Sequence, residues 1–485
     1  MTIPIATARA LNLISAHPAV DAIRVLEHSD DGTVGAEVDI ANELPAAWRV
    51  AGESPSGVRK LETIRLDFPE DYPAFAPKIS LRADFNRSHP HINRGPTDRP
   101  PQPCLIAGSP RELIQSRGIE RLIDQMVEWL DKAMMLKLND PTNGWEPVRR
   151  DNFDDFMVVD GVKMRALADS AGGCLAFQTA FFHLVEPEAQ FFSVDHRSNV
   201  AIELGKGRYA RGQISDKAYH GTSIGLIAWA PDHSAGQPFL ADQYLPETVS
   251  AVSDLLARAE QYGCRQQLEP KLNQIALGAD GRDLKSIPIA ITFLARRPYN
   301  VIGASSPIEL CSYLIDLSDL RDITKYDQAP VRMCSLREQL SVEILRRTSG
   351  LVETADRPKW TLIGGGSVGS KIATHLARRG QGPDLVVDKG FMSPPNYARH
   401  ALLPTHAVER GLISAKAALL ADGLEQLKQK PAVATDDVTV SCASPDGRAM
   451  IAPAGLDLLL NTTASTVARE RLSFANWENR PPIAD

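Results

Sequence analysis

Two histidines and one cysteine lie close together in the stretch "SHPHINRGPTDRPPQPCLI", which runs from Ser88 to Ile106. His89, His91 and Cys104 offer two imidazoles and a thiol, a mixture of ligands that zinc accepts. A loop cysteine can also be a redox thiol, or a nucleophile that carries an acyl group as a thioester. The spacing alone leaves these three possibilities open.

A second pattern with chemical potential is the glycine motif in "LIGGGSVGS". It places Gly364, Gly366 and Gly369 in G-x-G-x-x-G spacing, between a strand-like segment and a helix-like one. The backbone N–H groups and the positive end of such a helix attract phosphate. Asp388 follows the next predicted strand, 19 residues after Gly369, where a carboxylate can accept hydrogen bonds from ribose hydroxyls. The motif therefore favours nucleotide binding over a turn that only packs a helix on a strand.

The residues after Asp388 favour ATP over a dinucleotide used for hydride transfer. Asn396, Arg399 and Lys416 follow in order, and two of these three side chains are cationic. Hydride transfer has no need for cations there. Departing pyrophosphate does need them, because negative charge builds up on it as it leaves.

This ordered set resembles the ThiF/MoeB and ubiquitin-activating enzyme superfamily over about residues 355 to 475. The resemblance implies adenylation of a protein's C-terminal glycine, in which the carboxylate attacks the α-phosphate of ATP and releases pyrophosphate. It also implies that Asp388 holds the ribose. Asn396 and Arg399 would then contact the phosphates, and Lys416 would neutralise the leaving group.

Two features depart from that family. Ala464 stands where the family carries an aspartate associated with Mg²⁺, so ATP is expected while the metal ligands remain open. The chain also stops at Asp485, soon after this strand, which suggests a fragment or a reduced activating half without a second catalytic cysteine. Cys442 precedes the strand and is expected to be a core residue.

The N-terminal stretch resembles the ubiquitin-conjugating enzyme fold over about residues 20 to 145. The residues that match the pattern of that fold are Tyr72, Pro73, Pro77, His89, Pro90, Cys104 and Leu105. The resemblance implies that Cys104 accepts an acyl group and passes it to an amine. His91 occupies the place of the family's asparagine, and Asn93 lies two residues later, so either is a candidate for the group that assists the thioester chemistry.

An adenylating domain needs a thiol to receive its acyl group, so the thioester interpretation of Cys104 ranks first. Structural histidines rank second. Metal binding ranks last, because a fourth ligand is not obvious and Pro90 restricts how the two histidines converge.

The elements that must position these residues suggest a multidomain protein of α+β and α/β type. Residues 1–150 predict a conjugating-like α+β domain with an antiparallel meander, in which Ala10, Leu13 and Ile14 share one face of a first helix. Residues 151–330 predict a mixed α/β linking domain with strands near 189–194, 224–230 and 287–295.

Residues 331–485 predict a Rossmann-like ThiF-type domain. A helix over 335–350 leads into strands and helices that alternate, which is typical of parallel βαβ units. The segment "VTVSC" at 438–442 is expected to be one of the strands.

Bulk composition excludes some classes of function. A net charge of -7 argues against direct nucleic-acid binding. The sequence contains no apolar run of about 18 residues, so no membrane span is predicted. The N-terminus lacks the basic start and the uninterrupted apolar core of a signal peptide, which favours the cytoplasm. In that compartment, six scattered cysteines without a CxxC pair argue against a disulfide framework and against a four-cysteine zinc site.

Taken together, the chain resembles bacterial fusions of a conjugating and an activating enzyme, which occur in antiphage operons. The resemblance implies a partner protein with a C-terminal glycine (a nucleotidyltransferase or a ubiquitin-like protein), a JAB-family deconjugating peptidase and a homodimer. Arg337, Arg346 and Arg347 are expected on a helix, either as a solvated face or as arginines supplied across that dimer. A ThiF-like sulfur-carrier adenylyltransferase and a catalytically reduced scaffold are the alternatives.

Overall fold

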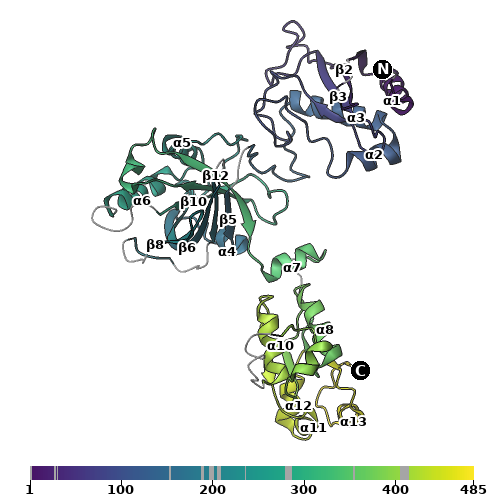
Figure 1. Ribbon diagram of the computed structural model, residues 1–485, viewed down its shortest axis with the longest axis vertical. Coiled ribbons are helices and arrows are strands. Elements are labelled where there is room, and N and C mark those ends of the chain that lie inside the picture. Colours follow the sequence, from purple (N-terminus) through teal and green to yellow (C-terminus); the bar gives the residue numbers. More distant parts are fainter. Residues whose placement is uncertain are drawn as a thin grey trace. The chain divides into compact units, whose positions relative to one another are not determined.

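The computed structural model places two compact units along the chain, residues 1–337 and residues 338–485 (Figure 1). The residues that the structure describes are 3–26, 29, 31–151, 155–186, 190–195, 201–204, 209–234, 236–278, 287–352, 356–404 and 414–485. Residues 27–28, at the end of the first strand expected in the meander, lie outside these residues. Residue 189, at the start of the strand expected near 189–194, lies outside them as well.

The first part of unit one is an antiparallel sheet with helices at its start and end. Helix α1 (Ile5–Ser15) precedes the strands, which pair in the order β1-β2-β3-β4. Their bounds are β1 (Val20–Val25), β2 (Val34–Ala41), β3 (Leu61–Phe68) and β4 (Lys78–Ser80). Helices α2 (Pro110–Arg117) and α3 (Glu120–Met134) follow a long loop. The predicted first helix and antiparallel meander are therefore confirmed.

The apolar periodicity of these elements explains which faces they bury. Strand β3 buries every second residue, and α3 buries residues at helical spacing, including Met126 and Trp129. The prediction for α1 was wrong at Leu13, which is exposed; Leu11 is buried in its place beside Ile14.

The middle part of unit one is a sheet that closes on itself. Its strands pair in the order β10-β11-β12-β5-β7-β6-β9-β8, and β10 also pairs in parallel with β9, which completes a barrel. The strands are β5 (Asp155–Val159), β6 (Gly173–Val185), β7 (Gln190–Asp195), β8 (Ala210–Ser215), β9 (Ala218–Trp229), β10 (Ile289–Arg296), β11 (Ile308–Ile315) and β12 (Val331–Glu338).

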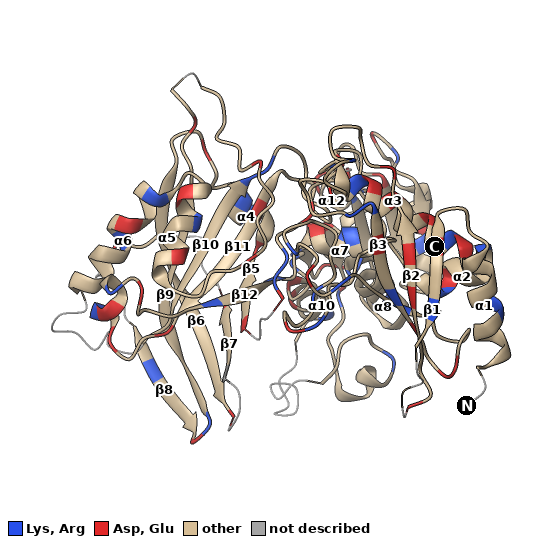
Figure 2. Ribbon diagram, turned by 90° about the horizontal axis from the view of Figure 1, so that it is seen from above, with Lys and Arg blue, Asp and Glu red and all other residues tan. Residues whose placement is uncertain are grey.

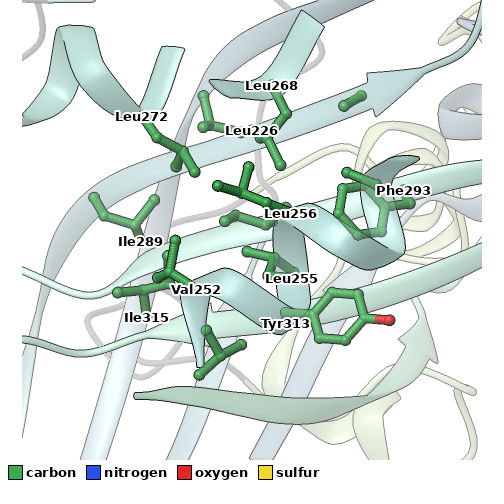
Figure 3. Packing of buried hydrophobic residues seen from close by; sticks show 14 of the residues in the cluster. Leu226, Val252, Leu255, Leu256, Leu268, Leu272, Ile289, Phe293, Tyr313 and Ile315 are labelled. Atoms are coloured by element: carbon green, nitrogen blue, oxygen red, sulfur yellow. The ribbon is translucent and has the colours of Figure 1, made fainter. Parts of the chain in front are cut away.

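Successive side chains of the barrel strands point alternately into the barrel and toward the helices that cover it. Leu294, Leu310 and Leu314 pack in one cluster with Met164 of α4 (Gly161–Arg165). Their neighbours on the strands pack instead under α5 (Val252–Gln261) and α6 (Arg265–Gly278), as Figure 3 shows for Leu255, Phe293 and Tyr313. A 3₁₀ turn, η1 (Leu320–Thr324), joins β11 to β12. Acidic and basic side chains are interspersed on α5 and α6 (Figure 2).

The predicted helix over 335–350 was wrong in its first half. Residues up to Glu338 belong to β12, and only α7 (Val342–Thr348) is helical, with Ser341 as its N-cap. Pairing of β12 with β11 overrides the helical pattern there, and the barrel extends beyond the expected boundary at 330. Arg337 therefore lies on a strand, and Arg346 is buried rather than solvated.

Unit two is a parallel sheet with helices on both faces, which confirms the predicted βαβ pattern. The strand order is β15-β14-β13-β16-β17, with bounds β13 (Trp360–Ile363), β14 (Leu385–Val387), β15 (Ala432–Ala434), β16 (Leu458–Asn461) and β17 (Ile483–Ala484). Helices α8 (Ser367–Ala377) and α10 (Lys416–Glu425) cover one face of this sheet. Helices α11 (Val438–Ser441), α12 (Pro445–Ile451) and α13 (Thr466–Phe474) cover the other.

The strand predicted for "VTVSC" was also wrong. Asp437 caps α11 by accepting a hydrogen bond from the backbone N of Thr439, so this β-branched segment becomes a short helix. Cys442 ends that helix and is buried in the core, as expected for a packing cysteine.

Among the described residues, no helix is long and apolar enough to cross a membrane.

Candidate functional site

Cys104 lies in a loop that is pinned to the histidine segment. Ile92 and Pro103 form an antiparallel bridge, and the backbone N of Cys104 donates to the carbonyl of His91 at 2.7 Å. The half-buried thiol lines a cavity of 260 Å³ together with Asn93, Leu105 and Ile79. A thiol in such a pocket is open to a small reacting group while its loop is held in place.

The backbone of His91 is the centre of this loop. Its carbonyl also accepts a hydrogen bond from Nε1 of Trp129 at 3.1 Å, which ties the loop to helix α3. His91 has a φ of 54°, a left-handed conformation that is uncommon for residues other than glycine and asparagine. Asparagine adopts this conformation readily, so the backbone agrees with the expectation that His91 takes the place of an asparagine.

Asn93 acts as a strut beside the thiol. Its backbone N donates to Gln102 at 2.7 Å, and its side-chain amide donates to the carbonyl of Pro103 at 3.1 Å. One amide donor of Asn93 is thus committed to the residue immediately before Cys104.

His89 is a structural residue. It is buried, its Nε2 lies 2.8 Å from the carbonyl of Ser56, and its ring contacts Phe85 and Trp129. Burial lowers the pKa of His89, so the ring is neutral and donates to Ser56. Among the described residues, no group of three or more His, Cys, Asp or Glu side chains is placed to hold a metal, so this geometry gives the metal hypothesis for the loop no support.

Glu146 is the residue near Cys104 that sequence reasoning missed. Its Oε2 lies 3.4 Å from Nδ1 of His91, and each of these two side chains is about a quarter exposed. Burial raises the pKa of the Cys104 thiol, and the negative charge of Glu146 adds to that rise. At rest the thiol is therefore protonated rather than a preformed thiolate.

The glycine motif opens a second pocket, at the carboxyl ends of the parallel strands of unit two. This cavity of 560 Å³ is lined by Gly364, Gly366, Asp388 and Lys416, among others. Gly366 is the N-cap of α8 and supplies no side-chain cap, so the first N–H groups of that helix are left for a ligand. The pocket has the position and the donors that an ATP phosphate chain needs.

Asp388 braces the glycine loop. One of its oxygens accepts from the backbone N of Gly365 and the other from that of Gly390, both at 2.7 Å. Each carboxylate oxygen keeps a further lone pair, so the same group can still accept from ribose hydroxyls.

Asn396 lies in a 3₁₀ turn, η2 (Pro394–Ala398), and Arg399 directly follows this turn. The side chain of Asn396 accepts hydrogen bonds from the backbone N and the hydroxyl of Ser393. Arg399 is exposed, and its carbonyl accepts from the Ser367 hydroxyl at the start of α8. Neither residue is among those that line the 560 Å³ pocket, whereas Lys416 is.

His400, the next residue, fastens this turn to the glycine loop. Its Nε2 lies 2.8 Å from the carbonyl of Gly365, and its Nδ1 accepts from the backbone N of Leu402 at 3.1 Å. Both bonds are satisfied only by a neutral ring protonated at Nε2, and burial lowers the pKa of His400 accordingly. No spacing pattern pointed to this residue.

The lowered pKa of His400 implies that the stability of unit two depends on pH. Its folded pKa lies below the ordinary value of 6.5, so the unfolded chain takes up the proton first. Stability is therefore full above that value and falls as the pH is lowered through it. We expect the midpoint of thermal unfolding to fall more steeply in acid for the unmodified chain than for His400→Gln; equal slopes in the two proteins would contradict this assignment.

Ala464 lies in the loop three residues after β16, with a φ of 53°, and carries no metal-ligating atom in its side chain. The neighbouring side chains are used locally: Thr462 donates to the carbonyl of Gly364 at 2.6 Å, and Asn461 accepts from the Thr463 hydroxyl. The residues present therefore suit a nucleotide, but the described residues hold no acidic cluster for Mg²⁺.

Comparison with known proteins supports the interpretation of the first part of the chain. Residues 7–169 match the sequence model of the family described as Prokaryotic E2 family A. E2 denotes the conjugating class, and the matched region contains Cys104, His91 and Glu146. It extends 19 residues beyond the expected domain end at 150.

Solved structures also match, over about half of their own length. TcdA (CsdL) has 25% identity and a TM-score of 0.22, covering 26% of this chain and 47% of that one. E. coli tRNA N6-threonylcarbamoyladenosine dehydratase, TcdA, has 23% identity and a TM-score of 0.22, covering 29% and 53%. Its complex with ATP has 24% identity and a TM-score of 0.22, covering 26% and 49%. No curated protein matches the chain.

Proposed function

We propose that this chain activates the C-terminal glycine of a partner protein with ATP and transfers the resulting acyl group through Cys104 to an amine. The observation that carries the proposal is the position of Cys104, a half-buried thiol in a 260 Å³ cavity of a region similar to prokaryotic E2 proteins. The glycine-loop pocket of unit two supplies a site of matching chemistry for the nucleotide.

The residues of unit two have distinct parts in this proposal. The open N-terminus of α8 binds phosphate oxygens, and Asp388 orients the ribose while it braces the loop. Lys416 stands on the pocket wall, where its charge stabilises the departing pyrophosphate. Asn396 and Arg399 lie on the adjoining turn and would meet the phosphates as the ligand is enclosed.

The partner in this proposal is a protein with an accessible C-terminal glycine, a nucleotidyltransferase or a ubiquitin-like protein, in an antiphage setting. The proposal also includes a homodimer of this chain and a JAB-family peptidase that removes the modification. A cytoplasmic location agrees with the six free cysteines.

Two measurements test the proposal. The full chain, mixed with ATP and a candidate partner, should catalyse ATP–pyrophosphate exchange and form a covalent adduct that thiols cleave. Cys104→Ala should abolish the adduct and leave the exchange intact, whereas Cys442→Ala, a change of a buried core thiol, should preserve both. An adduct that survives Cys104→Ala, or no exchange with any protein encoded nearby, would reject the proposal.

A second candidate is activation without conjugation, as in sulfur-carrier adenylyltransferases. The raised pKa of the Cys104 thiol favours it, since such a thiol is a weak nucleophile until a base assists it. Exchange without any thiol-sensitive adduct at Cys104 would support this candidate.

A further inference from the structure

Glu146 belongs to a segment, Trp145–Asp151, that is held by the barrel. Trp145 forms a parallel bridge with Val301, and its backbone N donates to Asn300 at 2.7 Å. The backbone N of Val148 donates to Oε1 of Glu309 at 2.7 Å. These bonds to β11 and to the loop before it fix both sides of Glu146.

The same segment is also bonded to the cysteine loop. Nη1 of Arg149 donates to the carbonyl of His89 at 3.5 Å, and Asp151 accepts from the backbone N of Gly95 at 3.4 Å. Glu146 lies between these attachments and reaches Nδ1 of His91. Its place beside the cysteine loop therefore depends on the middle part of the chain, to which the sequence assigned no role.

His91 and Cys104 are themselves neighbours across the bridge. They are directly opposite residues in the register set by Ile92 and Pro103, and the Cys104 N–H bonds the His91 carbonyl. Glu146, whose Oε2 lies 3.4 Å from the His91 ring, also acts on the Cys104 thiol through its charge. One carboxylate from the Trp145–Asp151 segment therefore acts on both residues of the cysteine loop.

We propose that His91 is the proton acceptor for acyl transfer at Cys104, and that Glu146 is the positioning residue that orients its ring. This inference rests on the proposed thioester function and adds a base to it. It also assigns a function to the barrel, which holds the segment that presents Glu146.

The steps balance without a further reactant. When Cys104 is acylated, its S–H proton passes to the ring of His91, the S–C bond forms and the bond to the donor's leaving group breaks. His91 then gives that proton to the departing group, so its ring is neutral again. When an amine then attacks the thioester, the C–N bond forms and the C–S bond breaks. His91 takes the proton of the amine and returns a proton to the sulfur, while the carboxylate of Glu146 stabilises the transient imidazolium.

The test separates loading from discharge in the full-length chain. Cys104 is loaded with the thiophenyl thioester of N-acetylglycine, and the acyl group at its peptide is followed by mass spectrometry. The loaded protein is then mixed with free lysine, or with hydroxylamine, which reacts with thioesters without a general base. The variants are His91→Gln, Glu146→Gln and Glu146→Asp, and Glu112→Gln on the exposed face of α2 is the matched loss of a carboxylate.

We expect His91→Gln to slow discharge to lysine on the order of 100-fold, and Glu146→Gln to slow it about tenfold, with partial recovery in Glu146→Asp. Discharge to hydroxylamine should be unchanged in all of them, and Glu112→Gln should match the unmodified chain. Normal lysine discharge in both His91→Gln and Glu146→Gln would overturn the inference. Failure of the unmodified chain to load Cys104 would instead reject the thioester function beneath it.

A second measurement distinguishes positioning from a general loss of structure. Iodoacetamide labelling of Cys104 across the pH range in which thiols titrate reports how readily the thiolate forms. Glu146→Gln removes a negative charge near the thiol and should move labelling to lower pH, although it slows lysine discharge. The other charged groups that act on Glu146 (Arg94, Arg149 and Glu309) stay in place in this variant. Labelling and discharge that change in the same direction would indicate a structural effect only.

Discussion

Gly369→Ala is expected to abolish the native glycine loop and, with it, the binding of ATP. A Cβ at Gly369 would lie 1.9 Å from the carbonyl oxygen of Gly364 and 2.4 Å from the Thr462 hydroxyl. The first of these is backbone and cannot move aside, so α8 must move away from the glycine loop. We expect unit two to lose about 3 kcal/mol or more of its free energy of unfolding.

Gly366→Ala is the control from the same motif. A Cβ there meets no atom within 4 Å, and the backbone is extended with a φ of -80°. Its cost should stay within about 1 kcal/mol, the usual range for an N-cap change. Hydrogen exchange of residues 360–370 and calorimetric titration with ATP would measure both variants. Native protection and ATP binding in Gly369→Ala would contradict the close approach of α8 to the glycine loop and to the end of β16.

Glu309→Ala is expected to destabilise the barrel by about 3–5 kcal/mol, because it leaves a buried guanidinium without its partner. Oε2 of Glu309 accepts from Nε of Arg297 at 2.8 Å, and the Arg297 side chain is 0% exposed. Oε1 of the same carboxylate holds Val148, so the change also frees one attachment of the Trp145–Asp151 segment. Hydrogen exchange should rise both in β10 and β11 and in that segment.

Lys325→Gln provides the comparison for this prediction. Lys325 pairs with Asp322 at 2.9 Å, but both side chains are about half exposed, and such surface pairs contribute about 0–1 kcal/mol. If Glu309→Ala were no more costly than Lys325→Gln, the pair with Arg297 would not stabilise the barrel. If hydrogen exchange rose in the barrel but not in residues 145–151, the position of Glu146 would not depend on the barrel.

Coupling between the barrel and the cysteine loop follows from these two roles of Glu309. A carboxylate that neutralises a buried arginine on one side bonds the segment carrying Glu146 on the other. Damage to the barrel core should therefore lower the rate of discharge from Cys104, even though the described residues that line the cavity of this thiol include none from the barrel strands.

Local patterns in the sequence determined the main elements. The glycine motif, the strand before it and the helix after it were predictable because tight turns and helix N-termini depend on neighbouring residues. The antiparallel meander was predictable for a similar reason, since period-two apolar patterns and proline turns act within a few residues. Cys104 was singled out by resemblance to the conjugating enzyme fold, and its role stays a prediction. The same reasoning was wrong for 335–338 and for "VTVSC", where pairing with β11 and the Asp437 cap decided the outcome.

The tertiary structure decided which distant residues meet. Glu146 stands beside His91 only because the barrel holds its segment, and His400 bonds Gly365 across 35 residues of chain. The closure of β10 on β9 is likewise invisible in any local window. Local spacing therefore pointed to the nucleotide loop and family resemblance pointed to the thiol, whereas the neighbours of both became visible only in the packed chain, because contacts between distant residues leave no periodic signal in the sequence.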